Sequence, residues 1–154
     1  MKTDILKDQS YSATIEVAVS PQDVFTHIND VSKWWTEDIK GHSTKLNDEF
    51  IVTSDCGHSS THKLIEVIPN KKEVWLVTDC KLDWVEKDKY EWVNTKIVFE
   101  ITPKGDITEL KFTHEGLVPE KECYSRCSQG WDMIIKERLY NLMMEDAGKS
   151  NILI

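Results

Sequence analysis

The stretch that decides the fold is EKECYSRCSQGWDMIIKERLYNL, residues 120–142. Its apolar side chains recur every three or four positions, and the charged side chains lie largely off that stripe, which predicts one long amphipathic helix. Glu120 and Glu122 favour the positive end of a helix dipole, and Gly148 is a suitable stop. The apolar stripe comprises Tyr124, Cys127, Trp131, Ile134, Ile135, Leu139 and Leu142.

The residues before this helix follow the two-residue period of half-buried strands. Compact turns at 69–72 and 103–106 join two pairs of these runs into hairpins. The strand-like runs are Tyr11–Val19, Phe50–Thr53, Thr61–Ile68, Glu73–Cys80, Trp92–Thr102 and Ile107–Glu115. The sequence therefore predicts an antiparallel sheet of about six strands.

A helix start follows the first strand. Ser20 suits the N-cap, Pro21 the first helical position, and Asp23 a capping-box-like arrangement. One short helix is predicted here, and a second after a break at Asn29-Asp30, because Val31, Trp34 and Trp35 repeat the apolar spacing.

The order of elements defines the fold class. One strand, two short helices, a meander of strands and one long helix form a two-layer α+β domain, because the helix must cover the apolar face of the sheet. The chain has 154 residues and no linker or repeat. We therefore expect a single domain over residues 1–154, with an ordered core over roughly residues 10–147.

The composition excludes several classes of function. The chain carries 27 acidic and 19 basic side chains, a net charge of −8, so its average field repels nucleic acid. No apolar run approaches the roughly 20 residues that span a bilayer, and the N-terminus has no signal-peptide core. We expect a cytoplasmic protein with no nucleic-acid partner and no membrane insertion.

The cysteines and histidines are candidates for reactive or metal-binding groups. Four cysteines without a dense framework indicate reduced thiols. Cys123 and Cys127 lie one helical turn apart. They are either buried structural thiols or a redox sensor. Cys56, His58 and His62 lack a fourth ligand and a known spacing, so we expect no metal and no cofactor.

An apolar cavity is expected between sheet and helix. Gly130 costs about 1 kcal/mol relative to Ala in a helix interior. Either the sheet approaches its backbone closely, or space is left beside Trp131 for a ligand. The candidate lining residues are Trp34, Trp35, Phe50, Trp75, Phe112, His114, Trp131 and Ile134, any of which could instead be core.

Two further features leave alternatives open. His114 follows Leu110 and Phe112 on the apolar side of its strand, as a polar group in the cavity or as a core histidine bonded to the backbone. The segment 81–92 carries Trp84, Tyr90 and Trp92 among charges. It is either a cavity lid or partner surface, or a hairpin extension with aromatic rings packed on one another.

The order and spacing of several motifs resemble a known family. They are Ser20-Pro21-Gln22-Asp23-Val24-Phe25, Trp34-Trp35, Val67-Ile68-Pro69-Asn70 with Trp75, Ile97-Val98-Phe99-Glu100-Ile101, Leu110 to Leu117, and Cys123 to Trp131. Nearly the whole chain resembles the START-like (SRPBCC) superfamily and, within it, the C-terminal domain of the activator of heat-shock-protein-90 ATPase. The resemblance implies the helix-grip fold and a pocket between sheet and helix, which many members use for lipids, sterols or aromatic polyketides.

Three functional hypotheses follow. The first is non-catalytic binding of a small hydrophobic or aromatic molecule, because no nucleophile elbow, phosphate loop, metal cluster or paired carboxylates occur. The second is a co-chaperone-like role in the stress response, which the resemblance implies. The third is an enzyme similar to the superfamily's cyclases and aromatases, with chemistry resting on His114 and pocket shape. We expect the first, and no catalytic residues.

Overall fold

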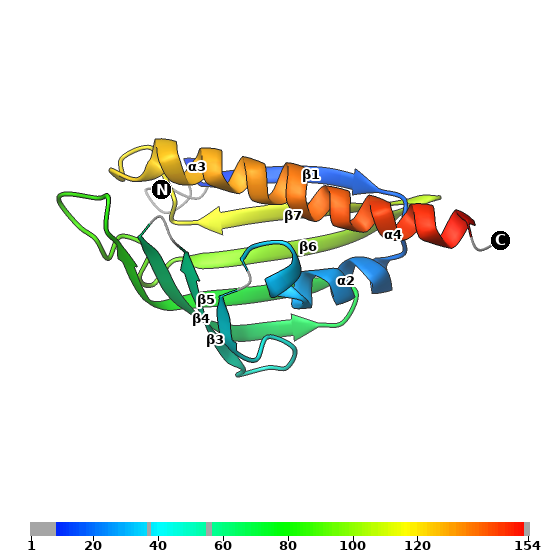
Figure 1. Ribbon diagram of the computed structural model, residues 1–154, viewed down its shortest axis with the longest axis horizontal. Coiled ribbons are helices and arrows are strands. Elements are labelled where there is room, and N and C mark those ends of the chain that lie inside the picture. The colour runs from blue at the N-terminus through cyan, green and yellow to red at the C-terminus, as the bar shows by residue number, and fades with distance from the viewer. Residues whose placement is uncertain (1–8, 37, 55–56, 153–154) are drawn as a thin grey trace.

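The computed structural model describes residues 9–36, 38–54 and 57–152, and one long helix lies along a curved sheet (Figure 1). Seven antiparallel strands pair in the order β1-β7-β6-β5-β4-β3-β2. They are β1 (Tyr11–Val17), β2 (Ile39–Gly41), β3 (Glu49–Ser54), β4 (His58–Ile68), β5 (Lys72–Leu82), β6 (Lys96–Lys104) and β7 (Ile107–Glu115). The α+β helix-grip prediction is confirmed, and the short strand β2 was not predicted.

Two short helices follow β1, as predicted. Helix α2 (Pro21–Asn29) begins with the Asp23 backbone N–H donating to Ser20 Oγ at 3.1 Å, and Pro21 occupies its first turn. The second is the 3₁₀ turn η1 (Val31–Lys33). The indole Nε1 of Trp34 donates to the His27 carbonyl at 3.0 Å, which satisfies an acceptor in the last turn of α2. Trp34 is thereby fixed under α2.

Several predicted boundaries were wrong. Strand β1 ends at Val17, and β6 begins at Lys96 rather than at Trp92 because Asn94 has φ of 71° and lies in a turn. The C-terminal helix begins at Tyr124, since residues 119–123 form turns, and it runs past Gly148. Side-chain alternation in the sequence continues beyond the point where strand pairing stops.

The C-terminal helix has three parts: α3 (Tyr124–Trp131), η2 (Asp132–Leu139) and α4 (Tyr140–Ile152). The η2 part is π-helical, with wider turns than an α-helix. Every fourth residue is buried against the sheet: Cys127, Trp131, Ile135, Leu139, Met143 and Ala147. Such a repeat drifts by about 40° per step around a regular α-helix. The wider turns of η2 counteract that drift and keep the stripe on the sheet.

The core is one continuous cluster between the sheet and the helices. Its largest members with less than 2% exposure are Trp34, Trp75, Trp131, Phe50, Phe99 and Phe112. Trp34 stacks on Trp75 with ring centroids 6.2 Å apart. Within the described part of the chain, no helix combines the length and apolarity needed to cross a bilayer. The aromatic core continues toward one end of the C-terminal helix, where the candidate site lies.

Candidate functional site

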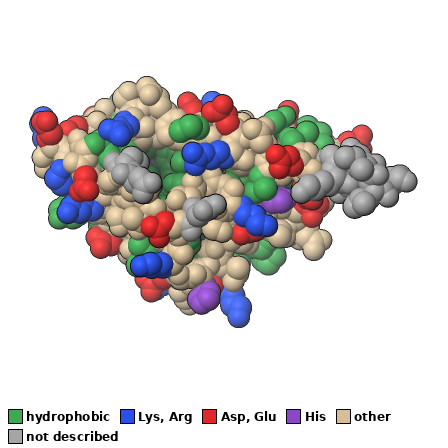
Figure 2. All heavy atoms as spheres, viewed as in Figure 1, with side chains coloured by type: hydrophobic (Ala, Val, Ile, Leu, Met, Phe, Trp, Pro, Cys, Tyr) green, Lys and Arg blue, Asp and Glu red, His purple; other side chains and the backbone are tan. Residues whose placement is uncertain are grey.

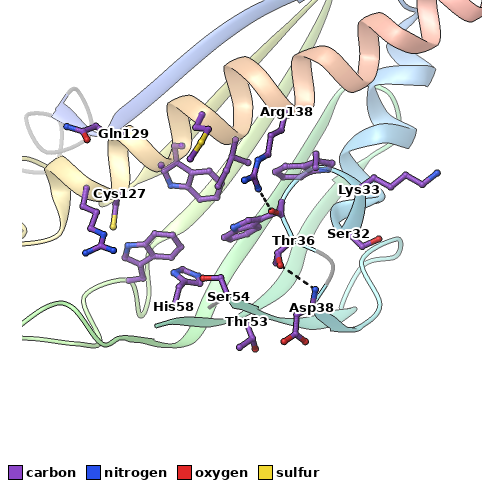
Figure 3. Close-up of a pocket in the computed structure, with 18 of the residues that line it drawn as sticks. Ser32, Lys33, Thr36, Asp38, Thr53, Ser54, His58, Cys127, Gln129 and Arg138 are labelled. Carbon is purple, nitrogen blue, oxygen red and sulfur yellow. Dashed lines mark hydrogen bonds between the residues drawn. The ribbon is translucent and has the colours of Figure 1, made fainter. Parts of the chain in front are cut away.

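A pocket of about 1150 Å³ lies between the C-terminal helix and the β3–β4 side of the sheet. The helix contributes residues between Arg126 and Arg138, and the opposite wall comes from Ser32 to Thr36, Asp38, the end of β3, and His58 at the start of β4. Figure 3 shows side chains from these separate elements converging on the pocket. On the molecular surface, hydrophobic atoms lie in a hollow beside Lys or Arg side chains (Figure 2).

Tryptophan dominates the walls. Five of the six tryptophans line the pocket, and Trp75 is the exception. The rings of Trp35 and Trp131 pack with centroids 4.8 Å apart, and Trp92 stacks on Trp131 at 5.8 Å. Trp84 comes from the β5–β6 connection and is half-buried. The walls are therefore built from aromatic side chains of three separate segments, which suits an aromatic or apolar guest.

His114 lies behind the pocket wall and holds it in place. The Trp131 indole N–H donates to His114 Nδ1 at 3.1 Å, so Nδ1 is the acceptor and Nε2 carries the proton. His114 Nε2 then donates to Thr95 Oγ1 at 2.8 Å, and the Thr95 hydroxyl donates to the Trp92 carbonyl at 2.6 Å. This chain of hydrogen bonds positions both Trp131 and Trp92. Burial, followed by the charges of Lys121 and His58, lowers the pKa of His114 to about 3.

A second polar row runs along β4. The Ser60 hydroxyl joins His58 Nε2 at 2.8 Å and His62 Nε2 at 2.7 Å. A hydroxyl has one proton, so it donates to one ring and accepts from the other, and the two neutral rings have opposite tautomers. Burial lowers the pKa of His58 to about 4 and that of His62 well below its usual value. Only His58 of this row lines the pocket.

Gly130 settles the alternatives left open by the sequence. A Cβ atom added there would meet no atom within 4 Å outside the helix's own turn, and Gly130 itself lines the pocket. The close approach of the sheet was therefore the wrong explanation. The missing side chain leaves open space beside Trp131.

The predicted site residues divide into two groups. Trp34, Trp35, Trp131 and Ile134 line the pocket, the three tryptophans with at most 6% exposure, whereas Phe50, Trp75, Phe112 and His114 lie in the core outside the lining. His114 bonds to side chains rather than to the backbone, as described above. The alternation of apolar residues along a strand shows which face of the sheet a side chain occupies. It does not show whether that side chain reaches the pocket, so core and lining residues could not be distinguished from the sequence.

Sequence reasoning missed several lining residues. The sequence indicated His58 only as a possible metal ligand, and it assigned Trp84 and Trp92 to a cavity lid or partner surface, or to a packed hairpin extension. Both of these tryptophans line the pocket. Arg126 and Arg138 also line the pocket and were not predicted. The signal in the sequence is that they are the only arginines of the chain and that both fall in its C-terminal helix.

The thiols and possible metal ligands show no reactive arrangement among the residues described. Cys80, Cys123 and Cys127 are free and buried. A hydrogen bond with Cys127 and then burial raise the pKa of Cys123, which favours the structural thiols over the redox sensor. No group of three or more His, Cys, Asp or Glu side chains in the described part could hold a metal ion, and Cys56 lies outside it.

Solved structures share this architecture. The Aha1 dimer from Colwellia psychrerythraea aligns with TM-score 0.71 and 20% identity over 88% of this chain and 96% of that one. Protein MLL2253 from Mesorhizobium loti aligns with TM-score 0.66 and 17% identity over 85% and 95%. DynU16, from the dynemicin biosynthetic locus, gives 0.61 and 15% over 87% of this chain and 46% of that one. At these identities the likeness shows the fold.

The family follows from the sequence itself. No curated protein matches the chain significantly. A family model described as Activator of Hsp90 ATPase homolog 1-like protein matches residues 22–144, which include α2, six of the seven strands and most of the C-terminal helix. The chain therefore belongs to the family of Activator of Hsp90 ATPase homolog 1-like proteins, with the START-like helix-grip fold.

Proposed function

We propose that this protein binds a small hydrophobic or aromatic molecule in the tryptophan-walled pocket, without transforming it. The observation that carries the proposal is the convergence of five tryptophans on one space of about 1150 Å³. Ligand pockets in proteins commonly have volumes of about 300–1,000 Å³ and mainly apolar walls. A guest with two or more rings fits this volume and can pack against Trp84, the tryptophan of the lining that is half-buried rather than buried.

The state of the polar groups supports binding without catalysis. A general base works best when its pKa lies near the working pH. The pKa of His58, the histidine that lines the pocket, is lowered to about 4, and its Nε2 is already bonded to Ser60. His114 is buried behind Trp131, and its ring nitrogens are already bonded to the Trp131 indole and the Thr95 hydroxyl. Both histidines are therefore suited to support the pocket walls, and neither is suited to act as a general base.

Native mass spectrometry of gently purified protein, followed by solvent extraction, tests the proposal. We expect a stoichiometric apolar adduct on the wild type. In Gly130→Leu the new side chain enters the pocket, so the adduct should be lost while the circular dichroism spectrum is retained. The matched control is Ser125→Leu, which adds the same side chain at an exposed position of α3 outside the lining.

The outcome that overturns the proposal is equally concrete. It is a wild-type protein that carries no adduct and shows no saturable binding of an apolar dye. Equal adduct levels in wild type and Gly130→Leu would also contradict it, because the adduct would then lie elsewhere.

The family description favours a second candidate, a co-chaperone-like interaction that modulates a chaperone ATPase. Both roles are proposed for a cytoplasmic protein, and cell fractionation tests this location.

A chaperone ATPase assay with purified protein tests the second role. Stimulation that persists in Gly130→Leu would assign the activity to a surface outside the pocket.

A further inference from the structure

The chain's only two arginines, Arg126 and Arg138, both line the pocket. Arg126 places its Cζ atom 4.6 Å from the centroid of a Trp84 ring. Arg138 reaches from η2 to the opposite wall, where it donates to the Trp35 carbonyl at 2.8 Å (Figure 3). Each guanidinium is thus held at the pocket by an uncharged group.

Neither arginine is neutralised in the part of the chain that the structure describes. The ion pairs found there join lysine or histidine to carboxylates and include neither arginine. A guanidinium has five N–H donors, and the bond to Trp35 uses one of them at Arg138. The remaining donors form the planar fork that recognises carboxylate, sulfonate or phosphate oxygens.

The charge of the lining contrasts with the charge of the molecule. Among the described residues, Lys33, Arg126 and Arg138 line the pocket with one acidic side chain, Asp38, and Lys33 is paired with Asp30 at 3.3 Å. The whole chain carries a net charge of −8. Lys33, Arg126 and Arg138 are therefore exposed cations gathered at a tryptophan-walled hollow, where their summed charge attracts an anion.

We infer that the ligand is an amphipathic anion, with an aromatic or apolar body against the tryptophans and one anionic group on the Arg138 guanidinium. This inference rests on the proposed function and specifies the chemistry of the guest. The Trp35 carbonyl holds one N–H of the Arg138 guanidinium in place, and the remaining N–H groups bind the anionic group. Arg126 adds a second positive charge at the Trp84 side of the pocket.

A pair of dyes that differ by one anionic group tests the inference. 1-Anilinonaphthalene-8-sulfonate has the body of N-phenyl-1-naphthylamine plus a sulfonate. Affinities are measured by calorimetry at low and high salt for the wild type, Arg126→Gln, Arg138→Gln and Lys136→Gln. In Arg138→Gln the glutamine amide can still donate to a carbonyl, so that variant removes the charge and keeps a donor. Lys136→Gln is the matched control, because Lys136 pairs with Asp132 outside the lining.

We expect Arg138→Gln to weaken sulfonate binding by about tenfold, the value of one charge-assisted hydrogen bond. A smaller loss is expected in Arg126→Gln, and none in Lys136→Gln. The neutral dye should bind all four proteins within about twofold, and only sulfonate binding should weaken with salt.

Two other results separate the possible failures. If both dyes bind the wild type and the arginine variants change them equally or not at all, the pocket binds apolar guests and the anion preference is overturned. If neither dye binds the wild type saturably, the proposed function fails together with this inference. Melting curves of each variant confirm that the folded proteins are compared.

Discussion

Single residues set the geometry of the pocket walls through hydrogen bonds that leave little choice of protonation state. An indole can only donate, so Trp131 makes His114 Nδ1 an acceptor and fixes the imidazole tautomer. The Thr95 hydroxyl oxygen then accepts a hydrogen bond from His114 Nε2–H, and the hydroxyl itself donates to the Trp92 carbonyl. Since all three side chains are buried, losing one member leaves a buried donor or acceptor without its partner.

Replacing Thr95 with valine tests this chain of bonds. Thr95→Val preserves the shape and leaves the His114 Nε2 proton without its acceptor, which should cost about 1–3 kcal/mol of unfolding free energy. Urea unfolding followed by fluorescence measures the change. The control is Thr14→Val on the exposed face of β1, where we expect a change within about 0.5 kcal/mol. Equal effects at both positions would contradict the network.

Glu73 is a buried carboxyl whose protonation should influence stability. Burial, opposed by the hydrogen bond that Trp75 Nε1 donates to it at 2.6 Å, raises the pKa of Glu73 from 4.5 to about 7. The folded state therefore binds this proton more tightly than the unfolded state. The resulting stabilisation is complete below pH 4.5 and is lost as pH rises through 7.

Glu73→Gln removes this titration and keeps an acceptor for Trp75. The variant should match the wild type near pH 4 and exceed its unfolding free energy by up to about 3 kcal/mol at pH 8. Denaturant unfolding at both pH values measures the difference, in which the histidine titrations common to both proteins cancel. A difference that does not change with pH would show that Glu73 is not the titrating group.

At the scale of elements, sequence patterns predicted which elements form better than where they end. Ser20 and Pro21 specify the start of α2 by local bonds, so that prediction was confirmed. Strand β2 is three residues long and shows no alternation, so no pattern identifies it. The four-residue repeat from Cys127 onward was interpreted as ordinary helical spacing, although it is maintained by the π-helical turns of η2.

Two glycines with open surroundings test the helix description. A Cβ at either Gly130 or Gly105 would meet nothing within 4 Å, but Gly105 has φ of +65° whereas Gly130 lies in the helix. Gly130→Ala should therefore stabilise the protein by about 1 kcal/mol, and Gly105→Ala should destabilise it by a similar amount. Thermal unfolding of both variants measures the signs. Destabilisation by Gly130→Ala would mean that the sheet does approach the helix backbone.

At the scale of the whole molecule, the sequence located the pocket between sheet and helix but could not delimit it. The sequence predicts Trp34, Trp35, Trp131 and Ile134 as lining residues, and in the structure each of them lies at the pocket. The other walls come from chain turns and from the start of β4, whose positions depend on tertiary packing that periodicity does not encode. Arg138 reaches the pocket because η2 lies opposite the Trp35 carbonyl, a contact between distant parts of the chain that the sequence pattern does not reveal.

Binding of a small apolar molecule in the tryptophan-walled space is tested most directly by the tryptophan indole N–H signals in a ¹H–¹⁵N spectrum. Titration with N-phenyl-1-naphthylamine should shift the signals of Trp84, Trp92 and Trp131 saturably, and that of Trp75, outside the lining, least. Single Trp→Phe variants assign the signals. Indole signals that stay unchanged up to the solubility limit of the dye, or a largest shift at Trp75, would contradict the claim.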